Sequence, residues 1–245
     1  MLIHKLHPRV LAFTTGRNED LSLKDSDDVV ATDTIPQQLR EDLGWGIDGF
    51  LPLALPRQTH TSHVVWASAP GREPGTDAVI TDVPGLCVCV KTADCIPVLM
   101  YDRVRNVVAS VHAGWKGTVR YIVRNTIDMM VRRGTNPDDV VAVIAPGISI
   151  DSFEVGDEVY GRFLQSGFPM DRIARCYPSN TPEQSGIACK WHIDLWEANR
   201  WVLEQCGVRD ISISGIDTYT SPEYYSARRE TIDTGRNFNG ILILP

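Results

Sequence analysis

The chain has 245 residues, 43% of them apolar, so it can bury a large core without disulfides or a metal ion. Its 31 acidic and 24 basic residues give a formal net charge of −7, and the basic residues are scattered along the chain. This pattern lacks the basic stripe of a nucleic-acid-binding protein, so we expect no nucleic-acid partner.

The first half of the chain predicts short strands. We expect one around 10–13, a short helix over 33–43, and further strands at 53–55 and 64–67. The following stretch, 68–77, is rich in Pro and Gly and is typical of a loop.

Three short apolar runs at 86–90, 96–101 and 107–111 are typical of buried strands. They follow one another too closely for helical crossovers, which favours a mixed sheet. Apolar residues at helical spacing then predict a helix over 118–133, which Gly134 ends.

The rest of the chain predicts strands at 140–145, 211–216 and 240–244, helices at 154–165 and 195–205, and an irregular segment at 169–189. Asp194 is a good N-cap for the last helix. Strands and helices mix without a strict βαβ alternation, and no linker divides the chain. We therefore expect an α/β or mixed α+β fold, with one mixed β-sheet flanked by helices in a single domain over 1–245.

The cysteines and the N-terminus bear on the compartment. Six cysteines in a chain of this length make no disulfide framework. The sequence has no long apolar signal region and no run approaching the ~18 apolar residues of a membrane span. These features predict a cytoplasmic protein without a membrane partner.

Reactive side chains lie at the ends of the predicted central strands, where a rigid scaffold exposes functional groups. Cys95 follows Asp94 at the junction of two strands, and His112 ends the third. Gln58 and His60 follow an earlier strand. These five residues form the candidate functional site.

Two imidazoles and a thiolate suit Zn²⁺, which leaves a fourth position for a water that becomes nucleophilic near neutral pH. The spacing of His60, Cys95 and His112 has no short metal-binding signature, so a core thiol with hydrogen-bonded imidazoles is the alternative. Asp94 lies in an apolar context, where an acid usually orients or titrates a neighbour. Asp77 supplies another carboxylate, in the turn 75–77.

Cations and glycines offer candidate anion sites. The segment 113–118 after His112 is typical of an anion-binding turn or of a plain strand-to-helix turn. Arg228, Arg229 and Arg236 can bind an anionic group through bidentate hydrogen bonds, or form a solvated basic patch.

Eight segments in order carry a family resemblance: QTH at 58–60, GTDAVIT at 75–81, KTADCIPV at 91–98, SVHAGWKGT at 110–118, IAPGI at 144–148, FEVGDEV at 153–159, HIDL at 192–195 and YYSARRE…TGR at 224–236. Together they resemble the YfiH/YlmD family of laccase-domain proteins, once labelled polyphenol oxidases. The resemblance spans nearly the whole chain.

The resemblance implies a layered α/β fold and zinc-dependent purine nucleoside phosphorylase activity on adenosine, inosine, guanosine and S-methyl-5'-thioadenosine, with adenosine deaminase activity. The implied metal ligands are His60, Cys95 and His112. The implied catalytic residues are these three and Asp94, and the implied substrate- or phosphate-binding residues are Gln58, Asp77, Lys116, Arg228 and Arg229.

The sequence departs from the family pattern at Thr61, where a glycine is common, and at Asp217, where a cysteine is common. Neither departure removes an expected ligand. The chain has six histidines but no His-x-His pair of the kind a multicopper oxidase needs for its trinuclear cluster. A single His₂Cys site could hold copper of the electron-transfer type, so copper is the less expected metal.

Two other functions are alternatives. The first, which the resemblance also implies, is editing of peptidoglycan precursors, in which Cys95 or a zinc-activated water hydrolyses an amide and an oxyanion hole is needed. A purine site instead needs stacking surfaces, for which Trp115 and Tyr225 are candidates. The second is a non-catalytic metal-binding interaction protein. The sequence predicts no oligomeric state.

Overall fold

The computed structural model describes residues 1–19, 31–32, 51–178 and 189–245. The helix expected over 33–43 lies outside these residues. No helix in the described part of the chain is long and apolar enough to cross a membrane.

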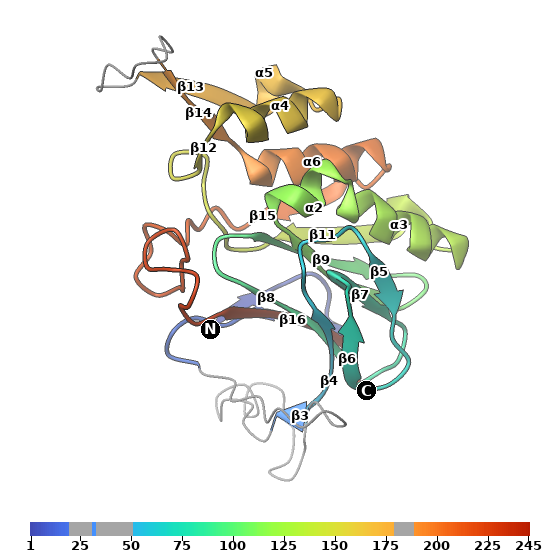
Figure 1. Ribbon diagram of the computed structural model, residues 1–245. Helices are drawn as coiled ribbons and strands as arrows, with labels where there is room; N and C mark the ends of the chain where they lie inside the picture. Colours follow the sequence, from blue (N-terminus) through green and yellow to red (C-terminus); the bar gives the residue numbers. More distant parts are fainter. Residues whose placement is uncertain (20–30, 33–50, 179–188) are drawn as a thin grey trace.

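Two large sheets and a small one form the β part of the molecule (Figure 1). The seven-stranded sheet has the order β1 (Leu2–His4), β2 (Val10–Thr14), β16 (Asn237–Ile243), β8 (Cys87–Thr92), β4 (Leu51–Arg57) and β3 (Ala31–Thr32), with β6 (Gly71–Pro74) also paired to β4. The six-stranded sheet has the order β15 (Asp210–Ile213), β11 (Val140–Ile144), β9 (Ile96–Asp102), β10 (Val107–Ala113), β7 (Ala78–Thr81) and β5 (Val64–Trp66). The small sheet has the order β12 (Glu154–Val155), β14 (Cys189–Ile193) and β13 (Ala174–Pro178).

The helices lie on one side of the six-stranded sheet (Figure 1). Those over its face are α2 (Trp115–Val119), α3 (Ile122–Arg132) and α6 (Leu195–Gln205), whereas α4 (Asp157–Gln165) and α5 (Met170–Ile173) accompany the small sheet. The large sheets contain both parallel and antiparallel pairs. The mixed, layered α+β fold is therefore confirmed, but the single expected sheet is wrong, because the strands divide into three sheets.

The central strand β9 explains the continuous apolar runs. Successive side chains of a strand point to opposite faces. Ile96, Val98 and Met100 pack against the helices, and Leu99 and Tyr101 pack toward the seven-stranded sheet. Because β9 is covered on both faces, its sequence shows no polar alternation.

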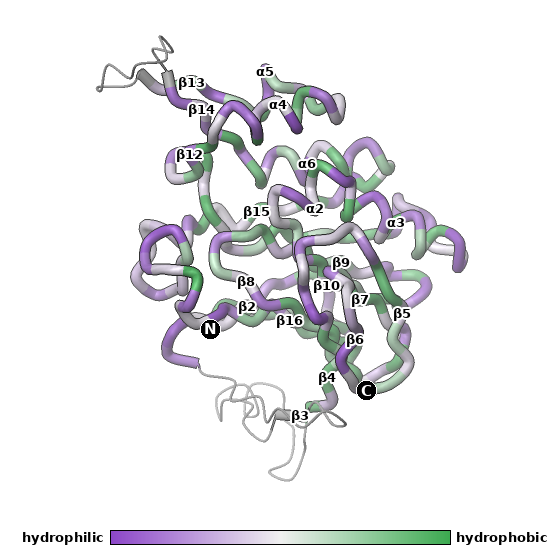
Figure 2. The backbone as a smooth tube through the Cα atoms, in the orientation of Figure 1, coloured by the Kyte–Doolittle hydropathy of each residue, from purple (hydrophilic) through white to green (hydrophobic). Residues whose placement is uncertain are grey.

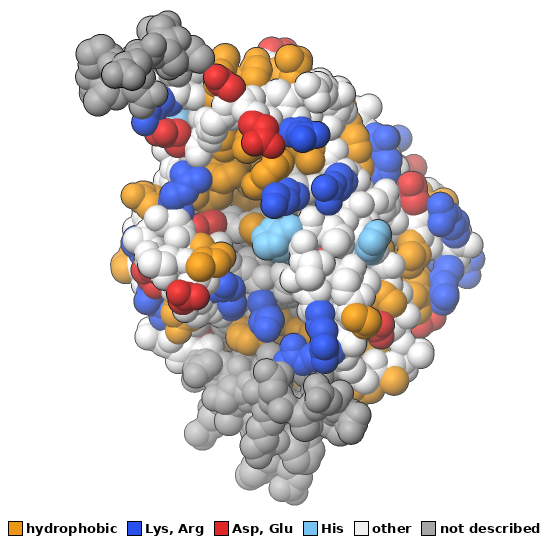
Figure 3. All heavy atoms as spheres, viewed as in Figure 1, with side chains coloured by type: hydrophobic (Ala, Val, Ile, Leu, Met, Phe, Trp, Pro, Cys, Tyr) orange, Lys and Arg blue, Asp and Glu red, His pale blue; other side chains and the backbone are white. Residues whose placement is uncertain are grey.

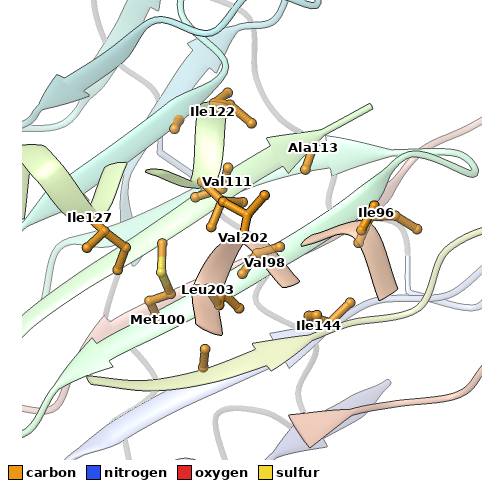
Figure 4. Packing of buried hydrophobic residues seen from close by; sticks show 14 of the residues in the cluster. Ile96, Val98, Met100, Val111, Ala113, Ile122, Ile127, Ile144, Val202 and Leu203 are labelled. Atoms are coloured by element: carbon orange, nitrogen blue, oxygen red, sulfur yellow. The ribbon is translucent and has the colours of Figure 1, made fainter. Parts of the chain in front are cut away.

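The largest cluster of buried residues lies between the six-stranded sheet and the helices (Figure 4). On α3, the apolar residues Ile122, Val123, Ile127 and Met130 are buried at helical spacing. Figure 2 shows hydrophobic segments along the central strands and hydrophilic ones in the surrounding loops. This packing gives the strand ends that carry the site a rigid support.

Four predicted segments differ in the structure. The helix expected at 154–165 begins at Asp157, because Glu154–Val155 form β12 in the small sheet. The expected loop at 68–77 contains β6, which pairs in parallel with β4. The expected helix over 118–133 is two helices, because Tyr121 adopts a left-handed conformation with φ 59°. The expected irregular segment at 169–189 contains α5 and β13 and the start of β14.

The helix expected at 195–205 is confirmed as α6, and the Asp194 side chain caps it by accepting a hydrogen bond from the Glu197 backbone N–H. Cys87 and Cys89 are buried free thiols, whereas Cys176 is disulfide-bonded. The cytoplasmic location stays a prediction.

Candidate functional site

His60, Cys95 and His112 meet where the two large sheets adjoin. His60 follows β4, Cys95 lies in the turn between β8 and β9, and His112 is in β10. One ligand atom from each residue lies within 4.8 Å of the other two. The Cys95 Sγ is 3.9 Å from His60 Nε2, and the two imidazole rings meet edge to face at 4.9 Å. The three side chains, which come from segments far apart in the sequence, therefore form one cluster.

Asp77 holds the His112 imidazole and the backbone of the turn that carries His60. It is fully buried directly before β7, and its Oδ1 lies 2.7 Å from His112 Nδ1. The same carboxylate accepts hydrogen bonds from the backbone N–H groups of Thr59, His60 and Thr61 and from the Thr61 hydroxyl. Because His112 Nδ1 is engaged, its Nε2 is the nitrogen left for the cluster.

The hydrogen bonds of Asp77 also fix its charge. Burial alone would raise the pKa of this carboxyl group, but hydrogen bonds from His112 and Thr61 outweigh burial and hold the pKa well below its usual value. Asp77 is therefore an anion at neutral pH. It is buried and orients the His112 ring and the turn at His60.

Asp94 anchors the turn that presents Cys95. Its φ of 86° is in the left-handed region, which costs energy for a residue other than glycine. One carboxylate oxygen accepts from the Thr218 hydroxyl and the other from the Arg228 backbone N–H, and its backbone carbonyl accepts from Ile148. These contacts hold the strained turn in place.

Cys95 and His112 stabilise each other's charged forms. Burial alone would raise the pKa of the Cys95 thiol, but the charge of His112 and hydrogen bonds with both imidazoles lower that pKa to about 6. Burial alone would lower the pKa of His112, whereas the thiolate charge and the Asp77 hydrogen bond raise it to about 9. At neutral pH the metal-free cluster thus holds a thiolate, the form that binds metals.

Gly114 leaves the space that the cluster occupies. A Cβ atom at this position would lie 2.8 Å from Cys95 Sγ and 3.2 Å from His60 Cδ2. The φ of Gly114 is −66°, so any residue could adopt its backbone conformation. The glycine is required for close approach rather than for an unusual turn.

A cavity of about 580 Å³ opens beside the cluster. His60, Cys95 and His112 line it together with Gln58. The described residues that line it also include four cations, Arg57, Arg72, Lys91 and Arg236, and no carboxylate. Figure 3 shows Lys and Arg side chains around the His side chains near the centre of this face. Such a cavity attracts an anionic ligand.

Of the other residues expected to bind substrate, Gln58 lines the cavity, whereas Arg228 and Arg229 are not in its lining. The Gln58 amide exchanges two hydrogen bonds with the Lys91 backbone, which joins the site segment to β8. The Arg228 guanidinium donates to the backbone carbonyls of Ser152 and Glu154. The Arg229 guanidinium donates to four backbone carbonyls between 218 and 224.

Lys116 is also absent from the described lining of this cavity. It lines a separate, smaller cavity between α2 and α4, next to the ring of Trp115. The structure therefore brings His60, Cys95, His112 and Gln58 together on the cavity and places Lys116, Arg228 and Arg229 outside its lining.

The two departures from the family pattern each find hydrogen-bond partners. The Thr61 hydroxyl donates to Asp77, an interaction that a glycine could not make. Asp217 accepts from the hydroxyl groups of Ser149 and Ser152. Burial would raise its pKa, but these hydrogen bonds outweigh burial and lower it.

The donor set of the cluster fits a soft or borderline metal ion. Two imidazole nitrogens and a thiolate are ligands that Zn²⁺ and copper both accept. A ligating histidine usually hydrogen-bonds a carboxylate through its other ring nitrogen, and Asp77 is that partner of His112. The residues present therefore fit a metal ion.

Sequence reasoning missed the cavity cations Arg57, Arg72 and Lys91. They come from β4, β6 and β8, which are neighbours in the seven-stranded sheet but far apart in the chain. Recognising β6 as a strand beside β4 would have brought these residues together. The Pro and Gly content of that segment instead favours a loop.

Comparison with known proteins gives consistent matches over the chain. A family model described as multi-copper polyphenol oxidoreductase laccase matches residues 14–244. A Bacteroides thetaiotaomicron protein named purine nucleoside phosphorylase is 45% identical over 205 residues, 78% of this chain and 73% of that protein. A Deinococcus radiodurans protein of the same name is 35% identical over 237 residues, 95% of this chain and 86% of that one.

A third relative, named adenosine deaminase RL5 and from an unknown prokaryotic organism, is 36% identical over 202 residues, 77% of this chain and 74% of that protein. Among solved structures, YfiH of Bacillus licheniformis matches with a TM-score of 0.78 and 26% identity, covering 96% of this chain and 92% of that one. A Neisseria meningitidis protein matches with a TM-score of 0.76 and 27% identity, covering 100% and 99%.

Proposed function

Because the chain belongs to the multi-copper polyphenol oxidoreductase laccase family, with relatives named for purine chemistry, we propose that it is a zinc-dependent purine nucleoside phosphorylase. Its substrates are adenosine, inosine, guanosine and S-methyl-5'-thioadenosine. It also deaminates adenosine, the reaction for which another relative is named.

The observation that carries the proposal is the position of the His60, Cys95 and His112 cluster on a cation-lined cavity. Phosphorolysis requires a phosphate dianion beside the ribose. Arginine and lysine side chains are the usual protein partners of phosphate. The cavity offers such side chains within the same lining as the cluster, which supports a phosphate-dependent reaction there.

In phosphorolysis a phosphate oxygen forms a bond to the ribose C1′ as the C1′–N bond to the purine breaks. We assign the holding of phosphate to Arg57, Arg72, Lys91 and Arg236, in place of Lys116, Arg228 and Arg229. Their positive charges bring the dianion to the cavity and offset its charge in the low-dielectric site. The purine leaves with the electrons of the broken bond and takes up a proton.

The cluster is the metal site of the proposed enzyme. His60, Cys95 and His112 hold the zinc ion, and Asp77 keeps the His112 ring oriented. When bound, zinc supplies Lewis acidity and lowers the pKa of a coordinated water, as deamination at purine C6 requires. Asp94 contributes by fixing the turn that carries Cys95, so we regard it as a positioning residue.

The donor set of the cluster fits a zinc ion better than it fits the multicopper site that the family's name describes. In the part of the chain that the structure describes, the only group of three such donors is His60, Cys95 and His112. A multicopper cluster needs many more imidazoles. The names of the relatives likewise support purine chemistry over muropeptide editing or a purely structural metal site.

Steady-state assays on adenosine with and without phosphate test the proposal. Arg72→Gln and Lys91→Gln should each lower phosphorolysis about tenfold or more, since a charged hydrogen bond contributes ~1.5–3 kcal/mol. Deamination, which uses no phosphate, should fall much less. Arg228→Gln is the matched control, because its guanidinium lies on backbone carbonyls outside the cavity lining. Equal losses in both reactions would refute the phosphate assignment.

A further inference from the structure

A second cavity, of about 300 Å³, lies between α2 and α4 and does not share lining residues with the cavity at Cys95. Trp115, Lys116, Val119 and Arg120 line it from the α2 side, and Glu158, Arg162 and Ser166 line it from the α4 side. Its volume is at the lower end of the range for small-molecule sites. We call it the α2–α4 groove.

Charge in the groove is predominantly positive. Lys116, Arg120 and Arg162 face one carboxylate, that of Glu158. Glu158 and Arg162 are 4.0 Å apart, and their side chains are 79% and 60% exposed. An exposed pair of this kind contributes little free energy, so an anionic ligand can replace Glu158 as the partner of Arg162.

The remaining two cations have no acidic partner within the described residues. The Lys116 ammonium lies over the Trp115 ring, 5.6 Å from its centroid. The Arg120 guanidinium makes no hydrogen bond or ion pair with any residue in the described parts of the chain. Two uncompensated cations and one weakly paired one in a 300 Å³ cavity suit a dianion such as a phosphate group.

The groove also has an aromatic wall. Trp115 is only partly buried and presents ring surface on the α2 side. Planar ligands such as nucleic-acid bases stack on such a ring. A ligand that joins a phosphate to an aromatic base would use both features of the groove.

We propose that the α2–α4 groove is a second ligand site, separate from the Cys95 cavity, that binds a phosphorylated aromatic small molecule of the nucleoside monophosphate class. Lys116, Arg120 and Arg162 hold the phosphate, and Trp115 contacts the base. This site accounts for Lys116, which lies in one of the sequence's two candidate anion sites and which the structure places outside the lining of the Cys95 cavity. The proposal does not depend on the proposed catalytic function.

Isothermal titration of the zinc-loaded full chain with AMP, adenosine and inorganic phosphate tests the groove. The Cys95 cavity is itself proposed to take adenosine and phosphate, so the groove's share of binding is the part that the double variant Arg120→Gln/Arg162→Gln loses. In this share AMP should bind more tightly than adenosine or phosphate, and the loss in AMP affinity should be at least tenfold. Arg132→Gln/Arg209→Gln, which removes the same charge from exposed positions outside the groove, should leave the groove's share unchanged. Arg72→Gln affects only the share of binding at the Cys95 cavity.

Four results would overturn the proposal: no AMP binding by the wild type, an equal loss in the control pair, a loss confined to Arg72→Gln, or phosphate binding as tight as AMP binding within the share that Arg120→Gln/Arg162→Gln loses. The last would show a site for free phosphate alone. Adenosine turnover measured in the same samples keeps the two proposals apart. It should persist in Arg120→Gln/Arg162→Gln, whereas failure of the proposed function would appear as absent turnover in the wild type.

Discussion

Asp77 is the residue on which the geometry of the cluster depends most. Its two carboxylate oxygens accept from the His112 ring, from three consecutive backbone N–H groups and from the Thr61 hydroxyl. It therefore sets the orientation of His112 and the left-handed turn at His60 together. Removing its charge should affect the metal site without touching a metal ligand.

For Asp77→Asn we predict a ten- to hundredfold loss of zinc affinity, which is the usual effect of removing the hydrogen-bond partner of a metal-ligating histidine. The amide also places a donor where backbone N–H groups need an acceptor. Competition with a chelator measures the affinity. Asp82→Asn, at an exposed position, is the charge-matched control. Unchanged affinity in Asp77→Asn would contradict the orienting role.

Gly114→Ala should disturb the cluster through a single methyl group. The added Cβ would lie 2.8 Å from Cys95 Sγ, so the thiol or the His60 ring must move. We predict loss of zinc and of purine turnover with little change in the melting temperature. Gly161→Ala is the comparison, because a Cβ there meets nothing within 4 Å. In helix α4 it should raise stability by ~0.5–1 kcal/mol.

The cluster itself could be found from the sequence, but its surroundings could not. His60, Cys95 and His112 are reactive residues at the ends of recognisable strands, and the structure brings them together. The sequence placed Asp77 in a turn but gave no sign that it contacts residues 16 to 35 positions away. The cavity cations were missed for the same reason, since pairing between distant strands brings them together.

Helix α6 shows how a local signal survives in the folded chain. Asp194 precedes the first helical residue and accepts a hydrogen bond from the third, as the sequence predicts. Burial raises the pKa of Asp194 even though this backbone hydrogen bond lowers it. The cap is thus a partly buried interaction that joins β14 to α6.

Asp194→Ala should lower the free energy of unfolding by ~1 kcal/mol, the usual cost of losing an N-cap. Denaturant titration of the wild type and the variant measures this difference. Asp194→Ser restores a capping oxygen and should recover most of the stability. If the serine variant is as unstable as the alanine variant, the cap is not what Asp194 contributes.

Other elements show where local signals fail. The apolar runs of β9 and β10 predict strands correctly because both faces of the strands are buried. The break between α2 and α3 leaves no trace in the sequence, since Tyr121 is not a residue that favours φ 59°. The Tyr121 hydroxyl donates to the Ser166 carbonyl and its ring stacks on Phe168, so tertiary contacts support the break.

A buried polar chain crosses the seven-stranded sheet. His4 Nε2 lies 2.9 Å from the Thr14 hydroxyl, which donates to Asn239 Oδ1, and Asn239 in turn donates to the Thr92 hydroxyl. Since the Thr14 hydrogen is used, Thr14 accepts from the His4 Nε2–H group. Burial lowers the pKa of His4 to about 4 from the ordinary value of 6.5.

This shift predicts an acid-labile fold. Between pH 6.5 and 4 the unfolded chain binds a proton at His4 that the folded chain does not, so stability falls as the pH falls through this range. The loss attributable to His4 is about 3 kcal/mol, complete below pH 4 and absent above pH 6.5. His4→Gln keeps a donor but cannot titrate. Denaturation curves at several pH values should show a shallower acid slope for this variant, and parallel slopes would contradict the prediction.

The central claim is that His60, Cys95 and His112 hold a zinc ion at which purine nucleosides react. The most direct measurement is metal analysis of the purified wild type beside Cys95→Ala, with both assayed on adenosine with and without phosphate. We expect near-stoichiometric zinc and phosphate-dependent adenine release in the wild type, with both lost in the variant while its melting temperature is kept. A Cys95→Ala variant that retains normal turnover would contradict it.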